Sequence, residues 1–261
     1  MKILFVGDIV GSPGRTAFAR TVTRWRQEQK VDVVIANAEN AAGGRGLTPA
    51  LAEELFNAGA DALTLGDHTW DQKELAPYLE QEPRIVRPAN FPPGCPGRGH
   101  TVVETPKGAV LVINLIGRVF MPAQDCPLRT ADAVLKEAAA RARIILVDIH
   151  AEATSEKIVT GRHLDGRVTA VVGTHTHVQT ADDGLLPKGT AYITDVGMTG
   201  PKDSVLGRAL EPVLRKFLTG MPTKFDIATD DVRLEGVLIE ADAKTGRARR
   251  IQRVCESLDG K

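Results

Sequence analysis

Seven short apolar runs rich in β-branched residues constrain the fold of this chain more than any other feature. They cover residues 2–6, 31–36, 61–65, 109–114, 143–148, 168–172 and 190–194. Their hydrophobicity is continuous rather than alternating, which indicates strands that are covered on both faces. Helical patterns lie between several of them, at residues 14–29, 48–58, 71–79, 131–142 and 205–219. Strand and helix alternate over residues 1–80, which predicts βαβ units, a largely parallel sheet and an α/β fold.

The remaining sequence predicts smaller elements and no second domain. Residues 84–115 are rich in Pro and Gly and indicate shorter strands and turns. Residues 232–242 and 248–258 predict an antiparallel hairpin around a turn at 243–247. A chain of 261 residues is long enough for one large domain or two small ones. Because no repeat, low-complexity tract or linker divides it, we expect a single domain over residues 1–261.

The composition limits the partners of this protein. The 33 Lys and Arg residues balance the 33 Asp and Glu residues, so the net charge is zero. This argues against binding to bulk nucleic acid or to an anionic membrane. Cys95, Cys126 and Cys255 lack CxxC spacing and fit a reducing compartment. The N-terminal apolar stretch is too short for a signal peptide or a membrane span. We therefore expect a soluble, cytoplasmic protein, and the sequence leaves open whether it forms a homo-oligomer.

Residues with metal-ligand chemistry follow five of the predicted strands. In an open α/β sheet, functional groups gather at the carboxyl ends of the strands. The candidates found directly after the apolar runs are Asp8, Glu39, Asn40, Asp67, His68, His150, His175 and His177. Taken singly, each is more common as a turn residue, a solvated loop residue or a satisfied histidine. Their coincidence at one edge of the sheet predicts a shared metal site.

The segment GTHTH, at residues 173–177, is the densest part of this pattern. His175 and His177 occupy alternate positions, which would place both rings on one face of an extended segment. Four of the six histidines of the chain belong to the pattern. The other two, His100 and His163, follow no strand end in this way, and we expect them at the surface.

The candidate ligands are too many for one ion. A single catalytic zinc needs about three protein ligands, whereas seven are present here before His68 is counted. Two ions about 3.5–4 Å apart, bridged by a carboxylate and a water-derived hydroxide, would use them all. Mixed oxygen and imidazole ligands suit iron, manganese or zinc, and the lack of thiolates argues against a soft-metal or Fe–S site.

The order of these motifs resembles a known superfamily. Asp8 is followed by NAEN (37–40), GDH (66–68), His150 and GTHTH (173–177). This order resembles the calcineurin-like metallophosphoesterases, and more closely the YmdB-like family of bacterial phosphodiesterases. The resemblance runs over nearly the whole chain. It implies a β-sandwich flanked by helices, with the site at the carboxyl ends of the strands.

The resemblance also implies a role for each candidate. One ion would be held by Asp8, Glu39, Asn40 and His177, and the other by Glu39, Asp67, His150 and His175. Glu39 would bridge the two ions, and a bridging hydroxide would attack a phosphodiester while His68 donates a proton to the leaving group. The implied substrates are small phosphodiesters, namely 2′,3′- or 3′,5′-cyclic nucleotides.

Two positions depart from the superfamily pattern. The first motif usually reads Asp-x-His, whereas here Ile9 and Val10 follow Asp8, so one expected ligand is missing. Asp67 stands where the third motif usually has Asn. Two divalent ions, a hydroxide and the carboxylates of Asp8, Glu39 and Asp67 sum to zero charge. We therefore expect firmer metal retention and weaker electrostatic help for the transition state.

Other residues and other functions remain open on the sequence alone. The glycine-rich loop at 41–46 carries Arg45, which would either contact a substrate phosphate or lie in a mobile surface loop. Thr154, Ser155 and Lys157 are candidates for positioning substrate. A nucleotide-sensing regulatory module with bound metal and slow turnover is the alternative from a different class, although a pure binding module would need no proton donor. A dinuclear amide hydrolase is disfavoured by the order of the motifs.

Overall fold

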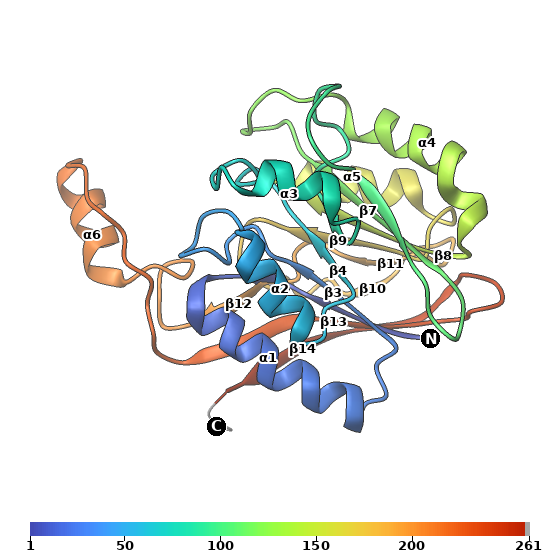
Figure 1. The fold of residues 1–261 in the computed structure, drawn as a ribbon, viewed down its shortest axis with the longest axis horizontal. Helices are drawn as coiled ribbons and strands as arrows, with labels where there is room; N and C mark the ends of the chain where they lie inside the picture. Colours follow the sequence, from blue (N-terminus) through green and yellow to red (C-terminus); the bar gives the residue numbers. More distant parts are fainter. Residues whose placement is uncertain (259–261) are drawn as a thin grey trace.

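The computed structural model describes residues 1–258, which form two β-sheets packed face to face with helices outside them (Figure 1). The first sheet has the order β2 (Asp8–Ile9), β12 (Met198–Pro201), β13 (Val232–Ala241), β1 (Lys2–Val6), β3 (Val33–Asn37), β4 (Ala62–Thr64) and β5 (Ile85–Val86), with β14 (Ala248–Ser257) paired to β13. The second sheet has the order β10 (Gly184–Leu185), β11 (Ala191–Ile193), β9 (Ala170–Thr174), β8 (Ile144–His150), β7 (Val110–Ile116) and β6 (His100–Val103).

Both sheets are mixed, which corrects the prediction of one largely parallel sheet. Strands β1, β3, β4 and β5 are parallel to one another, as are β7, β8, β9 and β11. In the first sheet β13 runs antiparallel to its neighbours β1, β12 and β14, and in the second β6 and β10 run antiparallel to their neighbours β7 and β11. The α/β class and the β-sandwich flanked by helices are confirmed.

The predicted C-terminal hairpin is confirmed, but its place in the fold was not predicted. β13 pairs with β14 on one side and with the N-terminal strand β1 on the other, both in antiparallel orientation. Leu4 lies opposite Leu238 in this pairing. The N-terminal strand and the C-terminal hairpin are therefore neighbours inside one sheet, and the hairpin is not a peripheral addition.

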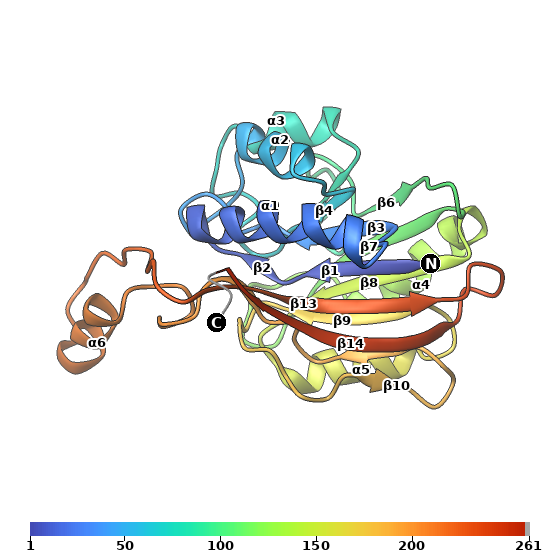
Figure 2. The ribbon, with the colours of Figure 1, turned by 90° about the horizontal axis from the view of Figure 1, so that it is seen from below.

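Helices cover the outer face of each sheet (Figure 2). α1 (Gly11–Glu28), α2 (Pro49–Asn57) and α3 (Leu75–Gln81) cover the first sheet, and α4 (Pro127–Ala138) and α5 (Thr154–Leu164) cover the second. β1 shows why the apolar runs are continuous. Its residues Leu4 and Val6 pack toward the helices, whereas Ile3 and Phe5 pack between the two sheets. Both faces of the strand are thus buried.

Helix boundaries differ from the predicted ones where side chains are used elsewhere. α3 begins at Leu75 and not at Asp71, because the Asp71 carboxylate binds Arg45 and His68 instead of capping a helix. α1 and α4 begin earlier than predicted, and α6 (Leu210–Thr219) begins later. α5 was not predicted. It buries the polar residues Glu156 and Lys157, so its sequence lacks the apolar periodicity of a helix that covers a sheet.

α6 projects away from the two sheets (Figures 1 and 2). Its apolar residues Phe217 and Leu218 are 82% and 76% exposed. None of the helices within residues 1–258 is both long and apolar enough to cross a membrane.

Candidate metal centre

The predicted site residues meet at one edge of the sandwich. β2 begins at Asp8, β3 leads to Glu39 and Asn40, and β4 leads to Asp67. The second sheet adds His150 at the end of β8 and the loop of His175 and His177 after β9. Because the parallel strands of both sheets end at this edge, residues up to 169 positions apart become neighbours, as for Asp8 and His177.

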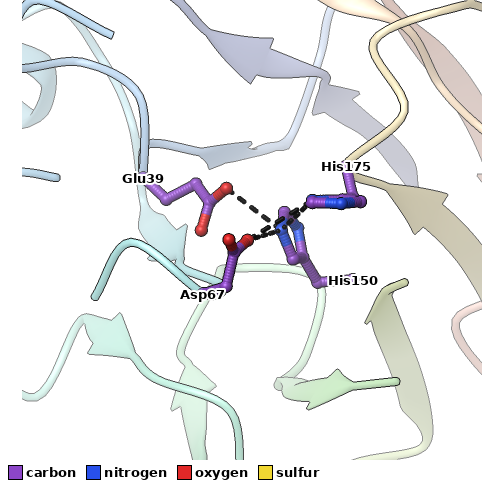
Figure 3. A group of neighbouring side chains, drawn as sticks. All are labelled: Glu39, Asp67, His150 and His175. Carbon is purple, nitrogen blue, oxygen red and sulfur yellow. Dashed lines mark hydrogen bonds and ion pairs between the residues drawn. The ribbon is translucent and has the colours of Figure 1, made fainter. Parts of the chain in front are cut away.

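Four of these residues form a compact group that could hold a metal ion (Figure 3). They are Glu39, Asp67, His150 and His175, and one ligand atom from each lies within 4.8 Å of all the others. His150 Nε2 lies 3.0 Å from Glu39 Oε1 and 3.0 Å from Asp67 Oδ1. His175 Nδ1 lies 3.3 Å from Asp67 Oδ1 and 3.0 Å from His150 Nε2. Two carboxylates and two imidazoles make a donor set suited to a transition metal.

A second group also contacts Glu39, through Asn40. Asp8 Oδ1 lies 3.6 Å from His177 Nε2, and Asn40 Nδ2 lies 3.4 Å from the same nitrogen. Asn40 Nδ2 also donates to Glu39 Oε1 at 3.3 Å. Asp8 is fully buried and its Oδ1 atom makes no hydrogen bond. A buried carboxylate oxygen without a hydrogen bond is costly, and a bound cation would satisfy it.

The outer nitrogen of His150 is held by a buried hydroxyl. His150 Nδ1 lies 2.9 Å from Thr174 Oγ1, and that hydroxyl donates to Asp148 Oδ1 at 2.8 Å. Since the hydroxyl proton is directed to Asp148, Thr174 Oγ1 accepts from His150 Nδ1. In the neutral form that binds a metal, this places the lone pair of His150 on Nε2, toward Glu39 and Asp67.

The other two imidazoles are oriented in the same way. His175 Nε2 lies 3.2 Å from Glu152 Oε2, which leaves Nδ1 free toward the compact group. His177 Nδ1 lies 3.3 Å from the carbonyl oxygen of Leu206, which leaves Nε2 free toward Asp8. Acceptors on the outer nitrogens fix the tautomer in which the inner nitrogens can bind a metal.

The charges of the site depend on one another. Burial opposes ionisation of Asp8, yet the neighbouring His177 holds the pKa of that carboxyl well below its usual range. Burial also opposes ionisation of Asp67, but His150 and His175 hold its pKa far below the usual range. Burial alone would lower the pKa of His150, but Glu39 and the other carboxylates raise it well above 6.5. Asp8 similarly outweighs burial and raises the pKa of His177. Carboxylates in such excess attract protons or cations.

His68 lies beside the compact group and not within it. Its backbone N–H donates to Glu39 Oε2 at 3.1 Å, and its Nδ1 lies 2.9 Å from Asp71 Oδ2. Its Nε2 is 4.0 Å from Asp67 Oδ2. Asp71 therefore orients the ring so that Nε2 faces the site. A pocket of about 250 Å³ opens here, lined by Glu39, Asn40, His68, Glu152, His175, Thr176, His177 and Leu206.

Three contacts of the site were missed by sequence reasoning. Glu152 follows His150 by two residues and Asp71 follows His68 by three, so their proximity in sequence was a readable signal. Leu206 acts through its backbone carbonyl, which no residue type reveals.

Several other candidates lie outside the pocket. Arg45 Nε pairs with Asp71 Oδ2 at 2.9 Å and does not line the pocket. Lys157 is buried beneath the loop of His175, and Thr154 and Ser155 begin α5 without lining the pocket. The remaining histidines also lie elsewhere, since His100 belongs to β6 and His163 pairs with Asp132 at 2.9 Å. Both are partly exposed.

Several known proteins are similar to this chain in sequence and in fold. A family model described as YmdB-like protein matches residues 4–254. A Bacillus subtilis protein named 2′,3′-cyclic-nucleotide 2′-phosphodiesterase is 50% identical over 97% of this chain and 96% of its own. A crystal structure of a hypothetical protein from Thermus thermophilus has 42% identity and a TM-score of 0.93, covering 98% of this chain and 99% of that one. A crystal structure of a phosphatase from Mycoplasma pneumoniae has 34% identity and a TM-score of 0.92, covering 98% and 93%. The chain belongs to the YmdB-like family.

Proposed function

We propose that this protein is a metal-dependent phosphodiesterase that hydrolyses cyclic nucleotides with two metal ions. The observation that carries the proposal is the convergence of Glu39, Asp67, His150 and His175 on one point beside a pocket. The name of the 50% identical Bacillus relative favours 2′,3′-cyclic over 3′,5′-cyclic nucleotides. The substrate is thus a small-molecule phosphodiester and not bulk nucleic acid.

In this proposal each of the two groups of side chains binds one metal ion. Glu39, Asp67, His150 and His175 would hold one ion, and Asp8, Asn40 and His177 would hold the other, with Glu39 available to both. The Oδ1 atom of Asp8, which is buried and makes no hydrogen bond, supports the second ion. Iron or manganese fits these oxygen and imidazole ligands best, and zinc is also compatible with them. Ile9 and Val10 are buried apolar residues, so the usual histidine of the first motif has no replacement there.

The bound ions supply an activated water and neutralise charge on the phosphate. His68 supplies the proton that the leaving oxygen needs. Its Nδ1–H donates to Asp71 and so directs Nε2 toward the pocket, and in the imidazolium form Nε2 carries the proton that is donated. In a 2′,3′-cyclic nucleotide the bond from phosphorus to O2′ breaks, O2′ takes the proton from His68, and the product carries a 3′-phosphate. General acid catalysis of this kind contributes roughly a hundred- to ten-thousand-fold in rate.

We also propose that residues 1–261 form one cytoplasmic domain. Both sheets contribute ligands, and β13 and β14 from the C-terminal region pair with one another beside β1, so the site spans the whole fold. The three cysteines are unpaired, which fits a reducing compartment. The exposed apolar residues of α6 are compatible with self-association.

Metal analysis and hydrolysis assays test the function together. Purified protein is stripped with a chelator, reconstituted with Mn²⁺, Fe²⁺ or Zn²⁺, and assayed with bis-p-nitrophenyl phosphate and with 2′,3′- and 3′,5′-cyclic AMP. We expect two ions per chain, activity only in the reconstituted protein, and preference for the 2′,3′-cyclic nucleotide. His175→Ala should lose metal, whereas the matched control His163→Ala should keep it.

Three other outcomes would contradict the proposal. Two bound ions with tight nucleotide binding but negligible turnover would indicate a sensing module. Hydrolysis of amides in place of phosphodiesters would indicate a dinuclear amide hydrolase. Phosphodiester hydrolysis that persists after complete metal removal would contradict metal dependence.

A further inference from the structure

The loop that carries His175 and His177 has a strained backbone. The φ angle is 97° at His175 and 61° at His177. Residues with a Cβ atom seldom adopt this left-handed region because it is sterically unfavourable. Two such residues separated only by Thr176 need support from the surrounding structure.

Asp195 supplies part of this support from below the loop. Its Oδ2 atom accepts hydrogen bonds from the backbone N–H of Thr176 at 3.1 Å and from Thr176 Oγ1 at 2.7 Å. Its Oδ1 atom accepts from the backbone N–H of Gly197 at 2.8 Å. Asp195 is fully buried and follows β11. The carboxylate therefore ties the loop after β9 to the segment after β11.

Lys157 completes the arrangement from α5. Its Nζ atom donates to Asp195 Oδ2 at 2.7 Å and lies 3.4 Å from Thr176 Oγ1. The side chain is only 1% exposed and runs against Gly173, where an added Cβ atom would lie 2.9 Å from Lys157 Cδ. Lys157 thus reaches the underside of the loop and does not face the substrate.

The energetics of this ion pair favour a role in loop conformation. Taking an ammonium and a carboxylate out of water costs about as much as their attraction returns, so apolar side chains would stabilise the same space at least as well. Apolar side chains could not accept the two hydrogen bonds of Thr176. The ion pair therefore fixes the conformation of the loop through hydrogen bonds that an apolar core could not make.

We propose that Lys157 and Asp195 are positioning residues that hold Thr176, so that the flanking His175 and His177 present their inner ring nitrogens to the metal ions. The inference rests on the assignment of these histidines as ligands in the proposed function. Neither Lys157 nor Asp195 belongs to the ligand set. Asp195 acts through Thr176, the one residue between the two histidines.

Mn²⁺ binding and hydrogen exchange in the full-length protein test this role. The variants are Asp195→Asn, Lys157→Met and Thr176→Val, with Asp165→Asn as the matched control. Asp165 is also a buried carboxylate that accepts backbone N–H groups, but it lies at the C-terminal end of α5. Mn²⁺ is titrated into metal-free protein, and exchange is followed in residues 173–177.

We expect Asp195→Asn and Lys157→Met to bind Mn²⁺ about 10–100-fold more weakly, as is typical when outer partners of metal ligands are removed. Thr176→Val, which keeps the N–H donor, should lose several-fold in affinity. Exchange in the loop of the metal-free variants should be about tenfold faster than in the wild type. Asp165→Asn should match the wild type in both measurements, even if its melting temperature falls.

The inference would be overturned if Asp195→Asn and Thr176→Val bound Mn²⁺ as tightly as the wild type and showed the same hydrogen exchange in the loop, whatever their melting temperatures. If Asp195→Asn fails to fold, Thr176→Val decides by the same two measurements, since it removes one hydroxyl from a partly exposed residue. A wild type that binds no Mn²⁺ would instead refute the proposed function. The two failures are therefore distinguishable.

Discussion

Gly66 lies so close to Glu39 that a Cβ atom at position 66 would sit 2.3 Å from Glu39 Oε2. The same atom would lie 2.3 Å from His150 Nε2. The end of β4 can therefore approach the shared carboxylate and the central imidazole only because residue 66 has no side chain. This close approach brings Asp67 into the group.

Replacing Gly66 by Ala should displace Glu39 and His150 and so weaken metal binding. Overpacking of this kind costs about 1–3 kcal/mol of stability, and we expect bound metal to fall below half of the wild-type content. Elemental analysis after reconstitution measures it. Gly184→Ala is the control, since the nearest atom to its added Cβ is 3.9 Å away. Full metal occupancy in Gly66→Ala would show that the site can relax around a methyl group.

Removing the His68 side chain should slow turnover without expelling metal. We expect His68→Ala to lower kcat by about 10²–10⁴-fold, because the leaving oxygen loses its proton donor. The backbone N–H of residue 68 would still donate to Glu39, so the ligand geometry should persist. Asp71→Asn should lower kcat by less, about tenfold, because the ring remains but loses its orienting acceptor. Loss of metal in His68→Ala would contradict the role of proton donor.

Asp67→Asn tests the charge balance of the site. The carboxylate contacts both His150 and His175, and replacing it would raise the net charge of the loaded site by one. We expect metal affinity to fall by about tenfold or more and kcat at saturating metal to rise. Metal titration and steady-state kinetics measure the two effects separately, with Asp71→Asn as the control for metal affinity. Unchanged metal affinity together with unchanged kcat would rule the idea out.

The stability of the metal-free protein should depend on pH in a defined window. The raised pKa values of His150 and His177 give stabilisation that is present below 6.5 and is lost as pH rises through their values in the folded state. The lowered pKa values of Asp8 and Asp67 give stabilisation that is present above 3.8 and is lost as pH falls through their values in the folded state. Stability should therefore be highest between about pH 4 and 6.5.

Thermal unfolding from pH 6 to 9 checks this window. A loss of about 1–2 kcal/mol would lower the melting temperature of the metal-free protein by roughly 2–8 °C. With Mn²⁺ present, the melting temperature should instead rise with pH, because metal and protons compete for the same imidazoles. The control His163→Gln, at a partly exposed ion pair, should leave both profiles unchanged. Identical profiles with and without Mn²⁺ would contradict the prediction.

The strands and the residues that follow them were readable from the sequence for a local reason. A run such as residues 2–6 is apolar at every position because Ile3 and Phe5 face the second sheet while Leu4 and Val6 face the helices. Most polar residues begin where this double burial ends, and the exceptions within strands, such as Asn114 and Asp148, are buried and hydrogen-bonded. The ligand-type residues therefore marked the strand ends.

Contacts between distant segments were not readable in this way. Alternation of strands and helices predicted one largely parallel sheet, whereas the motif resemblance predicted the β-sandwich that the structure has, because alternation does not record which strands pair. α5 was missed because its buried face carries Glu156 and Lys157, whose partners, the backbone after β7 and Asp195, lie more than thirty residues away. Leu206 was missed because it contributes a carbonyl group, and every residue has one.

The sequence by itself determined which side chains of ligand chemistry stand at the ends of buried strands, since local burial and the order of residues settle that. Only the tertiary structure decided that the C-terminal hairpin pairs with β1, that the Leu206 carbonyl lies beside His177 Nδ1, and that the strained loop of His175 rests on Lys157 and Asp195. The physical reason is that these contacts depend on packing between segments far apart in the chain, and a local pattern carries no information about the partner.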